Sequence, residues 1–156
     1  MKLVVMDPFD NELIRKLEEY IGETTTNFSF VEKYKSISEH YSKEEWERLN
    51  NNSNEVSELL ADVRDDNITA LCYIIGTKDN KLFQLDYFGK INKSFIKGST
   101  SYAFDMLGAE TVVISSNTIS EDTLVSEGFD TLGEDDGKNL YIKDREKYER
   151  NERALV

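Results

Sequence analysis

The sequence is poor in residues that cross-link the chain, bind metals or break regular structure. It holds one cysteine, one histidine, one proline and 8 glycines in 156 residues. A single cysteine excludes a disulfide within the chain and a cysteine-rich zinc site. Cys72 lies in the apolar run Ala-Leu-Cys-Tyr-Ile-Ile, where we expect a buried, unreactive thiol. With so few glycines and prolines, the chain should consist mostly of regular helices and strands.

Positive charge is also scarce. The 19 basic residues are outnumbered by 31 acidic ones, which gives a formal net charge of -12. Nucleic-acid phosphates and anionic membrane surfaces are bound through clustered Lys and Arg, so both are disfavoured as partners. No apolar run reaches the length of a membrane span or of a signal peptide. We therefore expect a cytoplasmic protein.

Aromatic and aliphatic residues, in contrast, are plentiful enough for a packed core. Hydrophobic residues make up 38% of the chain and aromatic residues 11%. A chain of this length buries roughly two-thirds of its unfolded surface and suits one domain. We expect a single domain over residues 1–143, followed at residues 144–156 by a charged tail that is mobile or a frayed helix.

The N-terminal half predicts helices between short connections. Residues 2–6 are typical of a strand, and Asp10 can cap a helix that ends at Gly22. A polar loop at residues 23–27 should lead into a short helix or an aromatic-rich loop that begins at Phe28. Residues 42–45 form a Ser-Lys-Glu-Glu capping box before another helix. The apolar positions after Ser53 recur at helical spacing and predict a surface helix; they are Val56, Leu59, Leu60 and Val63.

The C-terminal half changes to strands. Residues 68–77 and 81–88 are rich in β-forming residues and are joined by Lys-Asp-Asn, which is typical of a hairpin. The spacing predicts a helix over residues 94–107 with Ser94 as its N-cap, and then a strand over residues 109–115. Further segments are a short helix at 120–126, a strand from Phe129, a turn at 135–137 and a strand at 140–143.

A basic segment interrupts the acidic chain just before the predicted helix at residues 94–107. Lys90, Lys93 and Lys97 occur with no acidic residue between Phe88 and Tyr102. Lysines at a helix start oppose the helix dipole, whereas the unpaired N–H groups there favour an anion. The segment is therefore either an anion site or a solvated basic loop.

The order of elements and three motifs resemble the GNAT superfamily of acyl-CoA-dependent N-acyltransferases. The motifs are Leu-Gly-Ala-Glu-Thr-Val-Val-Ile at 107–114, Asn117 just beyond it, and Glu-Gly-Phe at 127–129. The resemblance implies an α/β (α+β) fold, a mixed central sheet of roughly six or seven strands flanked by helices. It also implies acetyl-CoA or another acyl-CoA as cofactor, and a small amine or a protein amine as acceptor.

The resemblance also implies positions for the site. Asp86 lies where the family often keeps a carboxylate, and would be either the general base or a charge at the sheet edge or surface. The acyl-CoA would contact five residues around the strand ends, namely Lys90, Asn92, Lys93, Ser94 and Asn117. Two features depart from the family pattern. The phosphate loop has no pair of glycines. Leu124 occupies the position of the tyrosine that usually acts as the acid. The other tyrosines that could supply the proton are Tyr87, Tyr102 and Tyr141.

Three hypotheses remain open at this point. The chain is an N-acyltransferase, a GNAT-like binding or regulatory module without catalysis, or an interaction protein of unrelated α/β fold. The arrangement of the strands at residues 81–88 and 109–115 distinguishes these hypotheses, because a cofactor slot requires the two strands to diverge.

Overall fold

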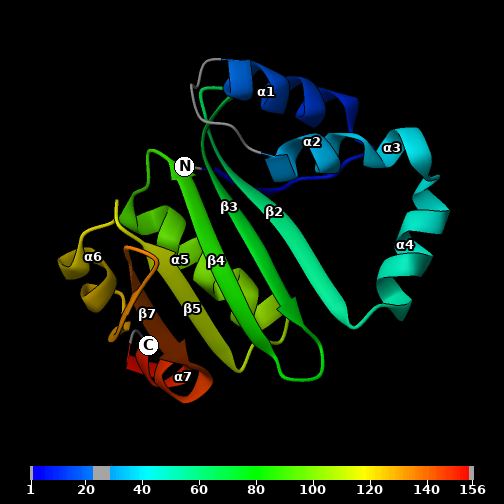
Figure 1. The fold of residues 1–156 in the computed structure, drawn as a ribbon. Coiled ribbons are helices and arrows are strands. Elements are labelled where there is room, and N and C mark those ends of the chain that lie inside the picture. The colour runs from blue at the N-terminus through cyan, green and yellow to red at the C-terminus, as the bar shows by residue number, and fades with distance from the viewer. Residues whose placement is uncertain (1, 23–28, 155–156) are drawn as a thin grey trace.

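The computed structural model describes residues 2–22 and 29–154 and shows one mixed sheet with helices on both faces (Figure 1). The strands are β1 (Lys2–Val5), β2 (Glu55–Arg64), β3 (Asn67–Thr77), β4 (Leu82–Gly89), β5 (Thr111–Ser116), β6 (Asp130–Asp135) and β7 (Lys138–Asp144). The helices are α1 (Asn11–Gly22), α2 (Ser29–Lys35), α3 (Ile37–His40), α4 (Lys43–Asn52), α5 (Lys93–Ser101), the π-helix η1 (Tyr102–Met106), α6 (Glu121–Ser126) and α7 (Arg145–Ala154).

The seven strands lie in the order β1-β2-β3-β4-β5-β7-β6. All neighbours are antiparallel except β4 and β5, which are parallel. A parallel pair needs a crossover connection, and α5 with η1 supplies it behind the sheet (Figure 1). The predicted mixed sheet with flanking helices is confirmed.

Each face of the sheet carries its own core. The core on the α5 side includes Phe95, Phe104 and the inward residues of β4 and β5. The core on the α1 side includes Leu17 and Tyr20 of α1. Because both faces of the sheet are covered, its central strands carry apolar residues at successive positions.

The predicted helix after Ser53 is wrong, because this segment is strand β2. Leu60 packs into the α5-side core, while Leu59 and Ala61 pack into the α1-side core. A strand that is buried on both faces has no simple alternation, and here its apolar positions coincide with helical spacing. Ser53 instead follows the end of α4, where its hydroxyl accepts a hydrogen bond from the Glu55 N–H at 3.1 Å.

Local signals elsewhere placed the elements correctly. Asp10 Oδ1 accepts hydrogen bonds from the N–H groups of Glu12 and Leu13 at 3.1 and 3.2 Å, which caps α1. The capping box of Ser42 and Glu45 is formed at the start of α4. The predicted loop at residues 23–27 and the residue Phe28 lie outside the described residues.

The charged C-terminal segment forms helix α7, which packs onto the domain. Tyr148 is buried, and its ring stacks on Phe104 with a centroid distance of 4.5 Å. Its hydroxyl donates to Asp105 at 2.7 Å, and Arg145 donates to the Phe104 carbonyl at 2.6 Å. Over the described residues this segment is therefore a helix that Tyr148 and Arg145 anchor to the domain.

Candidate functional site

The parallel strands β4 and β5 pair over four residues and then separate. Their Cα partners run from Leu82 with Thr111 to Leu85 with Ile114. Strand β4 nevertheless continues to Gly89, where it is still paired with β3 on its other side. Beyond Leu85, the main-chain groups on the β5 side of β4 therefore have no strand opposite them. We call this gap the β4–β5 slot; such an edge can bind an extended ligand as an added strand.

Asp86 is the first residue of β4 beyond the paired region. Its Cα partner on β3 is Tyr73, so the two side chains share one face of the sheet. Its carboxylate accepts a hydrogen bond from Gln84 Nε2 at 3.2 Å. The predicted base thus lies at the mouth of the β4–β5 slot, half-buried and accessible from the α1 side.

Helix α5 begins beside the slot, and its first turn departs from the sequence prediction. The N-cap is Asn92 and not Ser94, because Asn92 Oδ1 accepts the N–H of Phe95 at 3.0 Å. The Asn92 amide also donates to Asp62 Oδ2 at 3.1 Å. Its side chain is therefore committed to the fold, which argues against the predicted cofactor contact through the Asn92 amide.

The single glycine of this loop has a structural role in the fold. Gly89 has a φ of +94°, and a Cβ there would meet the Tyr20 hydroxyl at 2.5 Å and the Thr69 carbonyl at 2.6 Å. Only glycine allows this close approach. The glycine therefore lets the loop pack on α1 and β3, and it does not replace the glycine pair of the family's phosphate loop.

The other predicted cofactor contacts lie at two strand ends. Lys90, Lys93 and Ser94 are exposed around the start of α5, where the amides of Lys93 and Ser94 have no acceptor within the helix. Asn117 directly follows β5 and lines a cavity of 600 Å³ with Ser120 and Asn139. This cavity is on the β7 side of β5, so the structure does not bring Asn117 and the lysines into one pocket.

Leu124, at the position of the usual tyrosine acid, is fully buried in the α5-side core, and the three tyrosines considered as substitutes are in the following environments. The Tyr87 hydroxyl is 2.6 Å from Ser99 Oγ, and burial raises the pKa of Tyr87 well above its usual value. Burial, with a smaller effect from Glu58, raises the pKa of Tyr102 to about 12. Tyr141 is a buried residue of β7, opposite Ile114 of β5.

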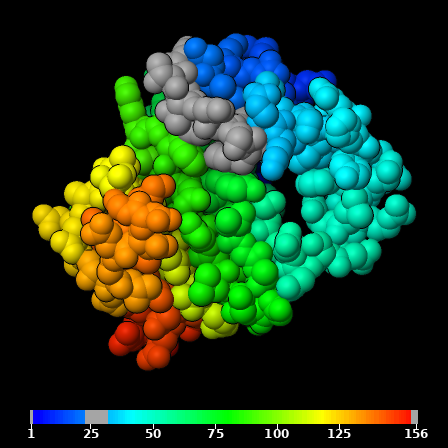
Figure 2. Space-filling view, in the orientation of Figure 1, coloured from blue at the N-terminus to red at the C-terminus, as the bar shows by residue number. Residues whose placement is uncertain are grey.

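A second cavity lies beside β2 and was not predicted from the sequence. It has a volume of 540 Å³ and lies between helices α2, α3 and α4 and the edge of β2. Figure 2 shows the hollow between the cyan surface of these helices and the green surface of the central strands. Glu58, Tyr34 and Tyr73 are among its lining residues. An acidic residue within the apolar run of β2 was the one sequence signal that could have pointed to it.

Two classes of site have no candidate in the described part of the chain. Residues 2–22 and 29–154 contain no group of three His, Cys, Asp or Glu side chains placed to hold a metal ion. Within the same ranges, no helix combines the length and the apolar character needed to cross a membrane.

No family model matches the sequence, and no curated protein matches it. Solved structures do match. A chimera of the spermidine N-acetyltransferase SpeG from Vibrio cholerae and hSSAT superposes with a TM-score of 0.64 at 14% identity, over 95% of this chain and 99% of that chain. PseH, an N-acetyltransferase from Campylobacter jejuni solved with acetyl coenzyme A, superposes with a TM-score of 0.58 at 12% identity, over 92% of this chain and 99% of that chain. FdhC, a nucleotide-linked sugar GNAT, superposes with a TM-score of 0.60 at 16% identity, over 98% of this chain and 91% of that chain.

The chain has the GNAT fold. The predicted resemblance is confirmed, and the alternative of an unrelated α/β fold is wrong. At these identities the likeness establishes the fold alone. The GNAT fold is shared with acetyl-CoA-dependent N-acetyltransferases, while the roles of Asp86, the lysines and Asn117 stay predictions.

Proposed function

We propose that this protein transfers an acetyl or related acyl group from an acyl-CoA to an amine, either a small molecule or a protein amine. The observation that carries the proposal is the β4–β5 slot, with Asp86 at its mouth and the start of α5 beside it. The structures of similar fold support it, since PseH was solved with acetyl coenzyme A and SpeG is a spermidine N-acetyltransferase.

The chain offers binding groups for each part of an acyl-CoA. Main-chain groups of β4 beyond Leu85 would bind the extended arm as a neighbouring strand does. The first amides of α5, with Lys90 and Lys93, would hold the phosphates. Asn117 would contact the arm from the end of β5. The bound group supplies an acyl thioester, which an amine can attack.

Asp86 would act on the acceptor. An amine attacks a thioester carbonyl only in its neutral form, so its proton must be removed directly or through a water. The Asp86 carboxylate can accept that proton at the slot mouth. The nitrogen–carbon bond forms, the carbon–sulfur bond breaks, and the electron pair leaves with sulfur. A thiolate is a weak base, with thiol pKa values near about 8.5, so it can leave as the anion where Leu124 supplies no proton, and solvent can protonate it afterwards.

One departure favours a second candidate, a GNAT-fold module that binds an acyl-CoA without transfer. Leu124 is buried where the family has an acid. This candidate predicts binding without turnover.

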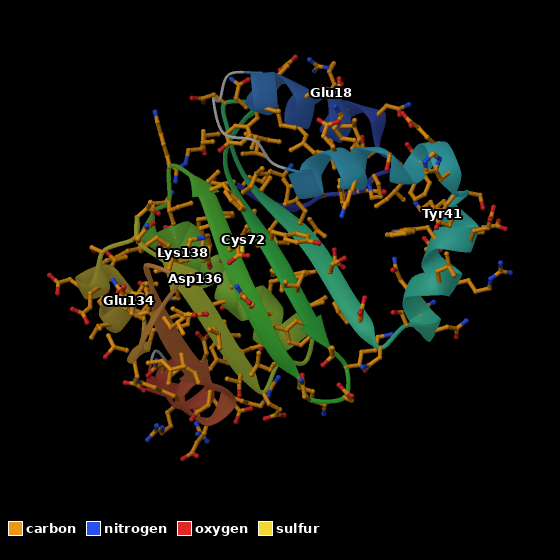
Figure 3. The ribbon with its side chains drawn as sticks, viewed as in Figure 1. Glu18, Tyr41, Cys72, Glu134, Asp136 and Lys138 are labelled. Atoms are coloured by element: carbon orange, nitrogen blue, oxygen red, sulfur yellow. The ribbon has the colours of Figure 1, made fainter. Side chains whose placement is uncertain are left out.

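A thiol-release assay separates the two candidates. Cys72 is fully buried in the middle of the sheet (Figure 3), so a thiol reagent applied to the native protein reports free CoA and not the protein. Acetyl-CoA with a panel of primary amines should give acceptor-dependent thiol release. Bound acetyl-CoA with no release above the acceptor-free control, for every amine, would favour the inactive module.

A further inference from the structure

A third cavity lies between helices α5, α6 and α7 and the end of strand β7, and it has a volume of 540 Å³. Lys143, in its wall, is the Cα partner of Val112 of the α5-side core, so its side chain lies on that face of the sheet. Asp86 shares the α1-side face with Tyr73. The cavity and the proposed base are therefore on opposite faces of the sheet.

Lys143 is only 6% exposed, which is unusual for a lysine. Its ammonium donates a hydrogen bond to the Glu127 carbonyl at 2.8 Å, and lies 5.8 and 5.5 Å from the ring centres of Phe129 and Tyr148. Among the described residues, no carboxylate lies within ion-pair distance of it. An ammonium has three donors, so this side chain has donors left for a ligand.

The glycine of the Glu-Gly-Phe segment makes room for this ammonium. Gly128 has a φ of +91°, and a Cβ there would meet the amide nitrogen of Asn151 and, at 3.0 Å, Lys143 Nζ. These two nitrogen atoms, from α7 and from β7, therefore converge over Gly128 beside the cavity. An ammonium and an amide placed together in this way suit the oxygen atoms of an anion.

The cavity lining carries three lysines and two glutamates, which are Lys97, Lys143, Lys147, Glu127 and Glu152. Lys147 forms an ion pair with Asp130 at 2.9 Å. Lys97 and Glu152 are exposed, and Glu127 is half-buried. Apart from Lys143, the charges of the lining are therefore balanced, and most of them are open to screening by solvent.

Lys143 is the charge that the fold leaves incompletely paired. Burial lowers the pKa of its ammonium below the ordinary value of 10.5. The charges of Glu127 and Glu152 act in the opposite direction, whereas those of Lys147 and Lys97 lower the pKa further. Because a buried charge without a close counterion is unfavourable, an anion bound in the cavity would stabilise the ammonium.

We propose that this cavity binds an oxyanion, the phosphate or carboxylate group of a small ligand, at the Lys143 ammonium with the Asn151 amide beside it. The volume of 540 Å³ leaves room next to that group for the rest of a small organic molecule. This site depends neither on acyl transfer nor on the binding of an acyl-CoA.

The test is a calorimetric titration of inorganic phosphate, and separately of succinate, at an ionic strength held constant with sodium chloride. Lys143→Met keeps an unbranched side chain without the ammonium and should weaken binding about tenfold or more. Glu152→Gln removes a carboxylate that repels the anion and should tighten binding several-fold. Lys138→Met removes an exposed lysine at the start of the same strand, labelled in Figure 3, and should leave the affinity unchanged.

Saturable binding of one probe alone assigns the ligand group as phosphate or as carboxylate. The start of α5 is another place for an anion, so both titrations are repeated in Lys93→Glu, where binding at the cavity should persist. Loss of all binding in Lys93→Glu would place the ion at α5 and overturn the proposal.

No saturable binding of either probe to the wild type, or wild-type affinity in folded Lys143→Met, would also overturn the proposal. Far-UV circular dichroism and thermal unfolding establish that each variant is folded. Glu152→Gln keeps the proposal falsifiable if Lys143→Met does not fold, because Glu152 is exposed and its replacement leaves the core intact. Unchanged affinity in Glu152→Gln would contradict an anion bound in this cavity.

Discussion

Tyr73 of β3 and Asp86 of β4 are Cα partners in the antiparallel ladder, and their side chains share the α1 face of the sheet. Tyr73 lines the cavity under α2–α4, whereas Asp86 lies where β4 leaves β5. Tyr73 therefore adjoins both the cavity and the residue proposed as the general base.

Asp86→Asn tests the chemical step. If this carboxylate takes the proton from the amine, the rate of acyl transfer should fall by roughly 10²- to 10⁴-fold at saturating substrates. Binding of acetyl-CoA should change little, because the slot is formed by main-chain groups. Glu44→Gln, an exposed carboxylate on α4, is the matched control and should retain the rate. A retained rate in the Asp86 variant would remove this residue from the mechanism.

Asn92→Asp tests the role of this side chain in the fold. Aspartate is as good an N-cap as asparagine, so α5 alone predicts no loss. Here the Asn92 amide donates to the buried Asp62 carboxylate at 3.1 Å, and the substitution would set two carboxylates against each other. The free energy of unfolding should fall by about 1–3 kcal/mol in denaturant titrations. Adding Asp62→Asn should restore most of that loss; an additive further loss would contradict this account.

Structural features that depend on neighbouring residues could be predicted from the sequence, whereas features that depend on distant residues could not. The caps at Asp10 and Ser42 and the β3–β4 hairpin are local, and all were predicted. Strand β2 was misread, because Leu59 and Leu60 pack into different cores and this is visible only once both layers exist. The Asn92–Asp62 contact joins residues 30 positions apart, and no spacing rule could have predicted it.

The candidate site divides in the same way. Asp86 and the start of α5 could be predicted, because the order of elements places them at the two sides of a diverging strand pair. The cavity beside β2 could not be, since it depends on how far β1 extends along β2 and on the positions of helices α2–α4.

Glu58→Gln has a predicted effect on stability. Burial raises the pKa of Glu58 above its ordinary value of 4.5, so the folded protein holds this proton at pH values where the unfolded chain has released it. The carboxylate therefore destabilises the fold as pH rises through the folded pKa, and has no such effect below the unfolded one. At neutral pH the variant should melt higher, by about 2 °C.

The gain from Glu58→Gln should disappear in scans near and below pH 4.5. Glu47→Gln, which changes an exposed carboxylate of α4, is the control, and its melting temperature should match the wild type at both pH values. A melting temperature of Glu58→Gln below that of the wild type at neutral pH would mean that Glu58 already has a partner in the fold.

Tyr148→Ala tests whether the charged C-terminal helix belongs to the domain. The substitution removes the ring that stacks on Phe104 and should destabilise the protein by about 3–5 kcal/mol. Tyr148→Phe keeps the ring and loses only the hydrogen bond to Asp105, which should cost about 1 kcal/mol or less. Chemical unfolding of both variants measures the difference. Wild-type stability in the alanine variant would make α7 a dispensable tail.

The most direct measurement is a calorimetric titration of acetyl-CoA into the wild type and into Lys93→Glu, with thermal unfolding of each. The β4–β5 slot predicts saturable binding and a higher melting temperature with ligand in the wild type. In Lys93→Glu the affinity should fall, while the melting temperature without ligand holds or rises, because an acid at a helix start favours the helix. No heat and no shift in melting temperature at millimolar acetyl-CoA would contradict the proposed function.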